Sequence, residues 1–252
     1  MQIDPIKQSK KITDFIKITF TSQGINKAVI AVSGGIDSAL SLALATKALG
    51  KEIIYTLELP YKRQSTELSS LIITHLDIPP NQRKIIKLSR AVDKLAIQLN
   101  AKKNPLRFGN ILARTRMICL FDQAKTNKAM VIGTENKSEK LLGYYTRFGD
   151  QASDLDPISH LYKTQVIKLA QHFKLPPAIL KALPSAGLWK DQTDESELGF
   201  SYQQADPILN LLVDQKFTPS QVISQGHDKL LVAKISKRLI AIDFKSKVPY
   251  HL

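Results

Sequence analysis

A strand-turn-helix segment near the N-terminus constrains the fold of this chain more than any other stretch. Residues 27–32 are β-branched and apolar, as in a buried parallel strand, and residues 38–45 are small, helix-forming and apolar nearly all round. Two adjacent glycines lie between them, in the sequence SGGIDS. Glycine permits positive φ and close approach of the backbone to a ligand, and consecutive amides at a helix N-terminus bind anions. The segment therefore predicts an α/β fold with a phosphate site in this turn.

The turn supplies the first candidates for ATP binding: Ser33, Gly34, Gly35, Ile36, Asp37 and Ser38. A plain helix cap formed by one of its polar side chains is the structural alternative. The order of strand, glycine pair, acid and hydroxyl favours a phosphate site. No lysine precedes Ser38, so the turn is not the GxxxxGK[ST] loop of ordinary nucleotide hydrolases. It resembles the pyrophosphate loop of the ATP pyrophosphatases, which split ATP between the α and β phosphates, and this resemblance implies that Asp37 helps to hold magnesium.

Strand and helix patterns alternate along the first half of the chain. Strands are predicted at 27–32, 52–59, 84–88 and 129–132, with helices over the first 20 or so residues and at 38–45, 65–76, 89–100 and 110–126, the last preceded by a loop at 102–109. Later helices are predicted at 161–173, 177–183, 206–215, 220–225 and 228–241. This rhythm predicts a doubly wound parallel sheet of about five strands flanked by helices. No repeat or linker divides the sequence, so one domain over 1–252 is expected.

Composition narrows the class of protein. The 252 residues are 43% hydrophobic, enough for a buried core, and no apolar run reaches the roughly 18 to 20 residues of a membrane span. Cys119 is the single cysteine, which excludes an internal disulfide and a zinc site of paired cysteines. A cytoplasmic enzyme fits these features. The net charge of +14 suits nucleic acid, an anionic membrane or polyphosphates, but the lysines are dispersed, so neither nucleic acid nor membrane is a predicted partner.

A second group of polar residues follows the strand predicted at 129–132. Glu139 supplies a carboxylate that, with Asp37, suits a magnesium ion, and Lys163 suits a phosphate. Loops after parallel strands carry the sites of such folds. Each residue also has a structural interpretation: Glu139 as the far member of a capping pair with Asn136, Lys163 as a solvated residue at a helix start, and Asp154 as a turn residue.

Five separated blocks resemble the ammonia-dependent NAD synthetases: SGGIDSA at 33–39, GNILARTRM at 109–117, VIGTENKSEKLLGYYTRFGD at 131–150, LYKTQV at 161–166 and PSAGLWKDQTDESELGFSY at 184–202. The resemblance implies an adenine nucleotide alpha hydrolase-like fold. It also implies ATP- and Mg²⁺-dependent amidation of deamido-NAD with ammonia, through an adenylated intermediate, with release of AMP and pyrophosphate. Family members are homodimers, so a homodimer is expected here, with the apolar helix at 110–126 either at its interface or in the core.

The resemblance also implies roles for individual residues. Those implied to bind ATP, beyond the turn, are Thr134, Lys163 and Ser185; those implied to bind the dinucleotide are Arg114, Arg147, Asp154 and Lys245; and those implied to hold magnesium are Asp37 and Glu139. Asp154 and Lys163 are the catalytic candidates, with Asp154 near the nicotinate ring and ammonia. Where the family has lysine, threonine and histidine, this chain has Arg147, Ser185 and Phe244. Residues 188–197 resemble the mobile segment that closes over ATP.

Two other functions compete with this interpretation. An RNA-modifying enzyme of the same fold would use the positive charge, but the lack of paired cysteines opposes thiolation, and the blocks at 109–117 and 131–150 oppose both thiolation and lysidine formation. A non-catalytic nucleotide-binding protein has no use for Glu139, Lys163 and a lid together. No glutaminase segment is present, so the predicted nitrogen donor is free ammonia or ammonia from a partner protein.

Overall fold

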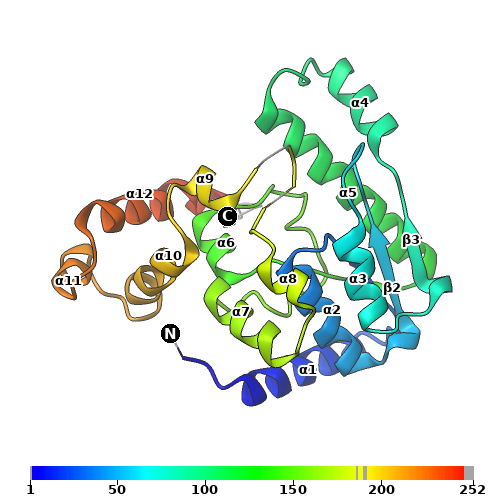
Figure 1. Ribbon diagram of the computed structural model, residues 1–252, viewed down its shortest axis with the longest axis horizontal. Coiled ribbons are helices and arrows are strands. Elements are labelled where there is room, and N and C mark those ends of the chain that lie inside the picture. Colours follow the sequence, from blue (N-terminus) through cyan, green and yellow to red (C-terminus); the bar gives the residue numbers. More distant parts are fainter. Residues whose placement is uncertain (1, 186, 190–191, 247–252) are drawn as a thin grey trace.

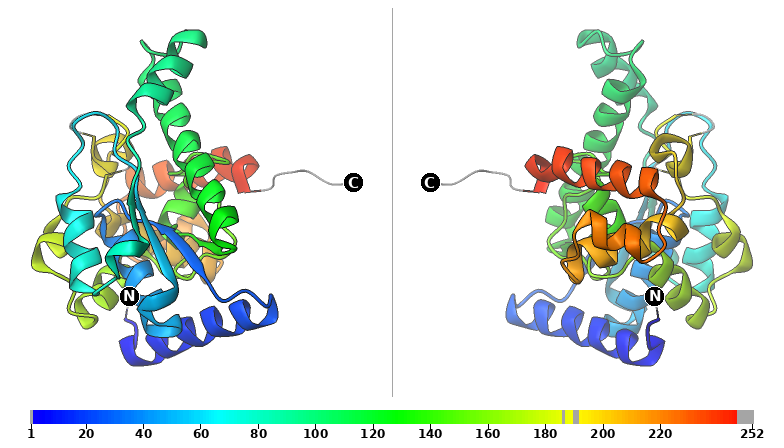
Figure 2. Two further views of the ribbon diagram at one scale, coloured as in Figure 1. Left: turned by 90° about the vertical axis from the view of Figure 1, so that its right-hand side faces the viewer. Right: turned by 90° about the vertical axis from the view of Figure 1, so that its left-hand side faces the viewer.

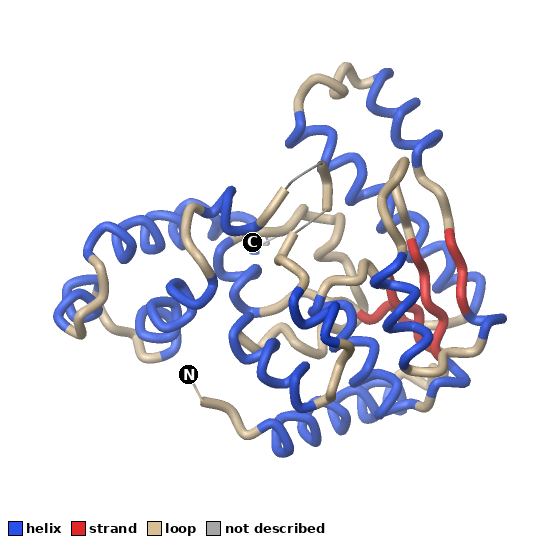
Figure 3. The backbone as a smooth tube through the Cα atoms, viewed as in Figure 1, coloured by secondary structure: helices blue, strands red, loops and turns tan. Residues whose placement is uncertain are grey.

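A parallel sheet of four strands forms the centre of the computed structural model, which describes residues 2–185, 187–189 and 192–246 (Figures 1 and 3). The strands are β1 (Ala28–Ala31), β2 (Ile54–Glu58), β3 (Arg83–Ile85) and β4 (Met130–Ile132), in the order β3-β2-β1-β4. Ala28 pairs with Ile54 on one side and with Met130 on the other. The chain therefore moves outward from β1 to β3 and then returns to the opposite side of β1. Ligands bind at such a switch in strand order, and the SGGIDS turn follows β1 there.

Helices cover both faces of the sheet (Figures 1 and 2). They are α1 (Pro5–Ser22), α2 (Ile36–Leu49), α3 (Glu67–His75), α4 (Ser89–Gln98), α5 (Pro105–Asn127), α6 (Lys137–Leu142), α7 (Lys163–His172), α8 (Pro177–Lys181), α9 (Asp194–Leu198), α10 (Tyr202–Leu209), α11 (Pro219–Ser224) and α12 (Lys229–Ser246). Short 3₁₀ turns at Lys51–Ile53 and Pro80–Gln82 and a π-helical segment at Asn210–Asp214 complete the described elements. None of these helices is long and apolar enough to cross a membrane.

Side chains alternate across the strands and divide the core into two layers. Ile30 and Ile132 face the layer that contains α1, α2 and α7, whereas Val29 and Val131 face the layer that contains α4 and α5. A third apolar cluster joins α10, α11 and α12 to α6. Because α6 packs on this cluster and α7 packs on α2, the loops between β4 and α7 lie between the sheet and the C-terminal helices.

The sheet has four strands, so the prediction of about five is corrected. Ile132 forms an isolated parallel bridge with Leu155 where a fifth strand would lie. Next to this bridge, the Val131 amide donates to the Asp154 carboxylate at 2.7 Å. The Asp154 side chain thus accepts from the Val131 amide, which a fifth strand would need as a backbone donor. The pairing of β4 with this segment therefore does not extend beyond the bridge.

The predicted loop at 102–109 is also corrected, because α5 begins at Pro105. The Asn104 side chain accepts a hydrogen bond from the Arg107 amide at 3.0 Å, and proline suits the first position of a helix. Gly109 lies inside α5 because another chain segment packs there. A Cβ on Gly109 would lie 3.0 Å from Leu188 Cδ1 and 3.3 Å from Trp189 Cζ3. The start of the predicted lid therefore rests on α5.

Candidate active site

The SGGIDS turn connects β1 to α2 and is held by its own serines. Ser33 Oγ lies 3.1 Å from Ser38 Oγ and accepts a hydrogen bond from the Gly35 amide at 3.2 Å. Ser38 Oγ also donates to the Gly35 carbonyl at 2.9 Å. Gly35 is the N-cap of α2, and no side chain caps this helix. The plain helix cap is therefore wrong, and no side-chain cap takes the first amides of α2, as an anion site requires.

Gly34 is required by the backbone at this turn. Its φ is +86°, and an added Cβ would lie 2.7 Å from Leu68 Cβ and 2.9 Å from the Ser69 amide nitrogen. Residues other than glycine rarely adopt this φ. The neighbouring atoms belong to the start of α3. The turn thus packs directly on α3, which holds it in position.

A buried lysine joins the turn to the segment after β4. Lys163, the first residue of α7, is 2% exposed, and its Nζ donates to the carboxylate of Asp37 and, at 3.2 Å, to Glu139 Oε1. Burial alone would lower the pKa of the Lys163 ammonium, but the two carboxylates outweigh it and raise the pKa above its usual value. Lys163 therefore stays charged at the end of the sheet where a phosphate would bind.

The interpretation of Glu139 as the far member of a capping pair with Asn136 is confirmed. Its amide donates to Asn136 Oδ1 at 3.0 Å, and its Oε2 accepts from the Asn136 amide at 3.4 Å, which completes a capping box on α6. Its other oxygen accepts from Lys163. Asn136 Nδ2 donates in turn to Asp37 Oδ1 at 2.9 Å. The cap therefore orients Glu139 toward Asp37.

Asp206, on α10, was not predicted as a site residue. It stabilises the arrangement of the elements that carry Lys163 and Glu139. It is fully buried, and it accepts hydrogen bonds from Ser138 Oγ at 2.6 Å and from the Thr164 amide at 2.8 Å. Ser138 Oγ accepts from the Lys163 amide at 2.8 Å. Asp206 thus fixes the starts of α6 and α7 relative to each other. A carboxylate among the apolar positions of a helix was the only local signal for this role.

Asp194 is a second residue that the sequence analysis did not identify. It begins α9, is 2% exposed and accepts a hydrogen bond from the Tyr202 hydroxyl at 2.9 Å, while its Oδ1 has no partner among the described residues. Burial raises the pKa of Asp194, and the nearby Lys163 ammonium opposes the shift. The predicted lid therefore adds a third carboxylate near Lys163.

Three of the four residues predicted to bind the dinucleotide gather around the segment 143–148. The Arg114 guanidinium donates to the Arg147 carbonyl at 3.3 and 3.2 Å. Lys245 Nζ, from α12, donates to the carbonyls of Gly143 at 2.7 Å and Tyr145 at 3.0 Å. The Arg147 guanidinium lies 5.7 Å from the centre of the Phe244 ring. The phenylalanine at this position therefore contacts the arginine that replaces the family's lysine.

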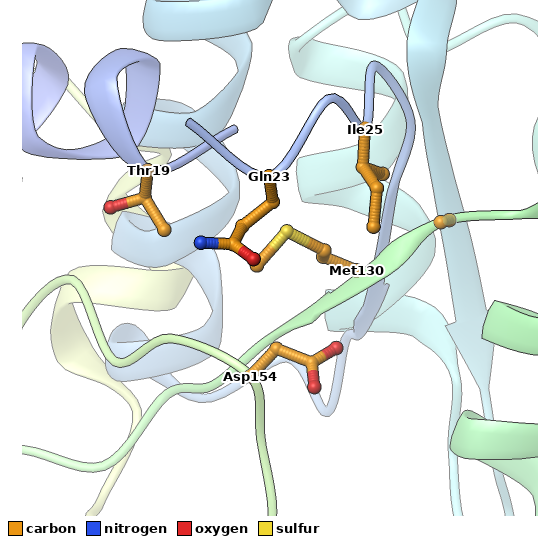
Figure 4. Close-up of a pocket in the computed structure, with 6 residues that line it drawn as sticks. Thr19, Gln23, Ile25, Met130 and Asp154 are labelled. Carbon is orange, nitrogen blue, oxygen red and sulfur yellow. The ribbon is translucent and has the colours of Figure 1, made fainter. Parts of the chain in front are cut away.

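Asp154 lines a pocket of about 350 Å³ with Thr19, Gln23 and Met130 (Figure 4), and none of the other predicted site residues lines this pocket. It is exposed and accepts a hydrogen bond from the Val131 amide at 2.7 Å. Met130 begins β4, whereas Thr134 follows its end. About 10 Å of extended chain separates residue 131 from residue 134, so the structure does not bring Asp154 to the Lys163 centre.

Thr134 and Ser185 complete the predicted ATP residues. Thr134 is half-buried directly after β4, beside the segment that carries Asn136. Ser185 is exposed, and its Oγ accepts a hydrogen bond from the Gly187 amide at 3.1 Å. Within the predicted lid at 188–197, residues 190 and 191 lie outside the described residues. Its described residues are 188–189, which lie against α5, and 192–197, which include most of α9.

Whether the site suits a magnesium ion depends on the donor atoms that its side chains offer. In the part of the chain that the structure describes, no three acidic, histidine or cysteine side chains are arranged to hold a metal ion. Asp37 and Glu139 nevertheless offer two carboxylates facing one point, where Lys163 binds both. Mg²⁺ typically takes one or two carboxylates and completes its shell with phosphate oxygens and water. The pair therefore fits a magnesium ion that arrives with ATP.

Comparisons with known proteins agree on one family. The NAD synthase profile matches residues 8–249. An NH₃-dependent NAD⁺ synthetase from Fusobacterium nucleatum is 38% identical over 243 residues, covering 95% of this chain and 92% of that protein. The solved structure of an NH₃-dependent NAD synthetase from Campylobacter jejuni superposes with a TM-score of 0.83 at 30% identity, covering 100% of each chain. The structure of an NMN synthetase from Francisella tularensis gives a TM-score of 0.85, also at 30% identity, covering 100% of this chain and 99% of that one.

Proposed function

This chain belongs to the NAD synthase family and is a carbon–nitrogen ligase with ammonia-dependent NAD⁺ synthetase activity, and from that membership we propose how its residues share the reaction. In the first step the nicotinate carboxylate of deamido-NAD attacks the α-phosphorus of ATP, which forms an adenylate and releases pyrophosphate. In the second, ammonia displaces AMP. The observation that carries this proposal is the buried Lys163 between Asp37 and Glu139, beside the uncapped turn.

Positioning and electrostatics supply most of the catalysis in this proposal. The amides of the turn and the Lys163 ammonium face the β and γ phosphates and stabilise the charge that develops on pyrophosphate. Asp37 and Glu139 hold the magnesium ion, which neutralises phosphate charge when it is bound. Burial raises the pKa of Glu139, with Lys163 opposing the shift and Asp37 adding to it. A bound divalent cation would favour the ionised form of Glu139 and would offset the repulsion between the Glu139 and Asp37 carboxylates.

The dinucleotide binds on the other side of the β4 end in this proposal. Arg114, Arg147 and Lys245 form a basic surface between α5 and α12, suited to the phosphates and carboxylate of deamido-NAD. The role of Asp154 toward substrate and ammonia rests on the resemblance, and its position beside Val131 adds no support.

A homodimer is also proposed. α5 buries Leu112 in the core but leaves Ile118 60% exposed, and Phe148 and Phe244 beside its N-terminal half are 52% and 50% exposed. One side of this helix is core, and the exposed apolar side chains on and beside its other side support the proposal, because exposed apolar patches mark protein interfaces. Sedimentation of the purified protein as a monomer would contradict the proposal.

The expected products test the proposed course of the reaction. Incubation with ATP, Mg²⁺, ammonium and deamido-NAD should yield NAD⁺, AMP and pyrophosphate in equal amounts. A parallel reaction with nicotinate mononucleotide tests the shorter substrate, because one similar structure is that of an NMN synthetase. Glutamine in place of ammonium should give no product with this chain alone. ADP instead of AMP, or AMP without amide, would contradict the two-step scheme.

Glu139→Gln is expected to raise the Mg²⁺ concentration needed for half-maximal rate by about 10-fold or more, because a ligand charge is lost. The amide oxygen keeps a hydrogen-bond acceptor for the capping box. Magnesium titration of initial rates at fixed ATP measures the effect. Glu195→Gln, an exposed acid on α9, is the matched control. Equal magnesium dependence in the two variants would exclude Glu139 as a ligand.

A further inference from the structure

Glu135 is a buried acid that the steps above do not use. It is 6% exposed, and its Oε1 has no hydrogen-bond partner among the described residues. It lies between Thr134 and Asn136, at the end of β4, and so next to the residue that binds Asp37. A buried carboxylate oxygen without a donor is costly, and such an atom calls for a ligand or water.

Tyr145, which interacts electrostatically with Glu135, carries a second buried atom without a partner in the described chain. The side chain is 8% exposed, and its hydroxyl has no partner within the described part of the chain. Burial raises the pKa of Tyr145 to about 12, and the negative charge of Glu135 adds to the shift, so the two groups act on each other. A small molecule between them would meet one carboxylate acceptor and one hydroxyl that both donates and accepts.

The surroundings of Glu135 favour a cation. Burial is the largest cause that raises the pKa of Glu135. The carboxylates of Asp156, Glu139 and Asp150 raise it further, and the Lys140 ammonium opposes them. Asp156 lies against the strand end itself, since a Cβ on Gly133 would be 1.8 Å from its Oδ1. Lys245 approaches Tyr145, but its ammonium is bound to two backbone carbonyls. The negative charge around Glu135 is therefore not neutralised by a direct ion pair in the described chain.

The position fits the second step of the reaction. Asn136, the next residue, belongs to the Asp37 and Lys163 centre where ATP is proposed to bind. Tyr145 belongs to the segment that holds Arg147 and Lys245, where the dinucleotide is proposed to bind. An ammonium ion held by Glu135 and Tyr145 would adjoin both proposed substrate sites, and it becomes the nucleophile ammonia when it transfers a proton to the Glu135 carboxylate. The reacting carboxylate, which is an anion, would be repelled from the same place.

We propose that Glu135 and Tyr145 bind the ammonium ion that supplies the nitrogen of the new amide. One N–H group of the ion donates to the Glu135 oxygen and another to the Tyr145 hydroxyl. Its positive charge offsets the negative charge of the surrounding carboxylates. The inference rests on the proposed function, and it assigns to Glu135 the role that the resemblance gives to Asp154. A bound water is the alternative occupant of the same atoms.

Initial rates against ammonium chloride, at fixed pH and saturating ATP, Mg²⁺ and deamido-NAD, test the assignment. Glu135→Gln should raise the apparent KM for ammonium about 10-fold or more, since the cation loses the negative charge of the carboxylate, and Tyr145→Phe about 3-fold, since the cation loses one hydrogen bond to a neutral hydroxyl. The KM for ATP and the deamido-NAD-dependent exchange of pyrophosphate into ATP should stay unchanged. High ammonium should restore most of the rate in both variants. In the double variant the KM effect should be smaller than the product of the single effects.

Three outcomes would overturn the assignment: an unchanged ammonium KM in both single variants, which indicates water; a loss of exchange that parallels the loss of rate, which indicates a structural role; or a rise in ammonium KM for Asp154→Asn alone. If Glu135→Gln does not fold, Tyr145→Phe decides by the same measurements. Failure of the proposed function is distinguishable, because the wild-type protein would then show no exchange and no NAD⁺.

Discussion

Replacement of Lys163 by methionine is expected to lower the rate of NAD⁺ formation about 100-fold to 1,000-fold, the effect of removing one preorganised charge from a transition state. Methionine keeps the length of the side chain but removes the ammonium that binds Asp37 and Glu139. The pyrophosphate then leaves without that charge, so exchange of pyrophosphate into ATP should fall with the overall rate. Both rates are measured at saturating substrates.

Lys137→Met is the matched control for this variant. Lys137 is the first residue of α6 and pairs with Asp214 at 2.5 Å, but the two side chains are 22% and 36% exposed. Partly exposed ion pairs contribute little, roughly 0 to 1 kcal/mol, so this variant should retain nearly full activity. Equal activities of the two variants would show that Lys163 has no part in the first step.

The same variant has an expected pH signature. Burial raises the pKa of Glu139 to about 8 although Lys163 opposes the shift, so removal of the ammonium favours the protonated acid still more. A carboxyl group whose folded pKa exceeds its unfolded pKa destabilises the fold as pH rises from the lower value to the higher. Thermal unfolding of Lys163→Met should therefore show stability that continues to fall above about pH 8, where the Glu139 contribution in the wild type has levelled off. A parallel pH dependence in both proteins would contradict this account.

Gly34→Ala is expected to raise the KM for ATP about 10-fold to 100-fold, since displacements near 1 Å of a positioned group have effects of this size. The added methyl group would lie 2.7 Å from Leu68 Cβ and 2.9 Å from the Ser69 nitrogen, so the turn must move away from α3. The positive φ of +86° adds a local cost of about 1 to 2 kcal/mol. Thermal unfolding and ATP titration of initial rates measure the two effects separately.

Gly24→Ala separates backbone strain from displacement of the turn. Gly24 follows α1 at a φ of +63°, and an added Cβ there meets no atom within 4 Å. It should lose stability through φ alone and keep the wild-type KM for ATP. If Gly34→Ala behaved in the same way, the close contact between the turn and α3 would have no role in ATP binding.

Local patterns predicted most of the fold because strands and helices depend on neighbouring residues. The alternation of apolar runs identified the four strands and most of the helices around them, but not the short helices α6 and α9. The errors occurred where a local signal met a tertiary one. Gly109 indicates a loop by itself but lies inside α5 because Leu188 and Trp189 pack on it, and the segment near Leu155 forms one bridge rather than a strand because the Asp154 side chain binds the β4 backbone.

The amino-acid sequence by itself determined the SGGIDS turn, the order of strands along the chain and the residue types needed to bind ATP. Residues far apart in the chain had to be brought together before their chemistry was defined. Lys163 meets Asp37 across 126 residues, and Asp206 joins α6 to α7 from 68 residues beyond Ser138. Burial, pairing and pKa depend on these long-range contacts, which no local pattern contains. For the same reason Asp154 lies beside Val131, and Glu135 and Tyr145 each keep a buried atom without a partner among the described residues.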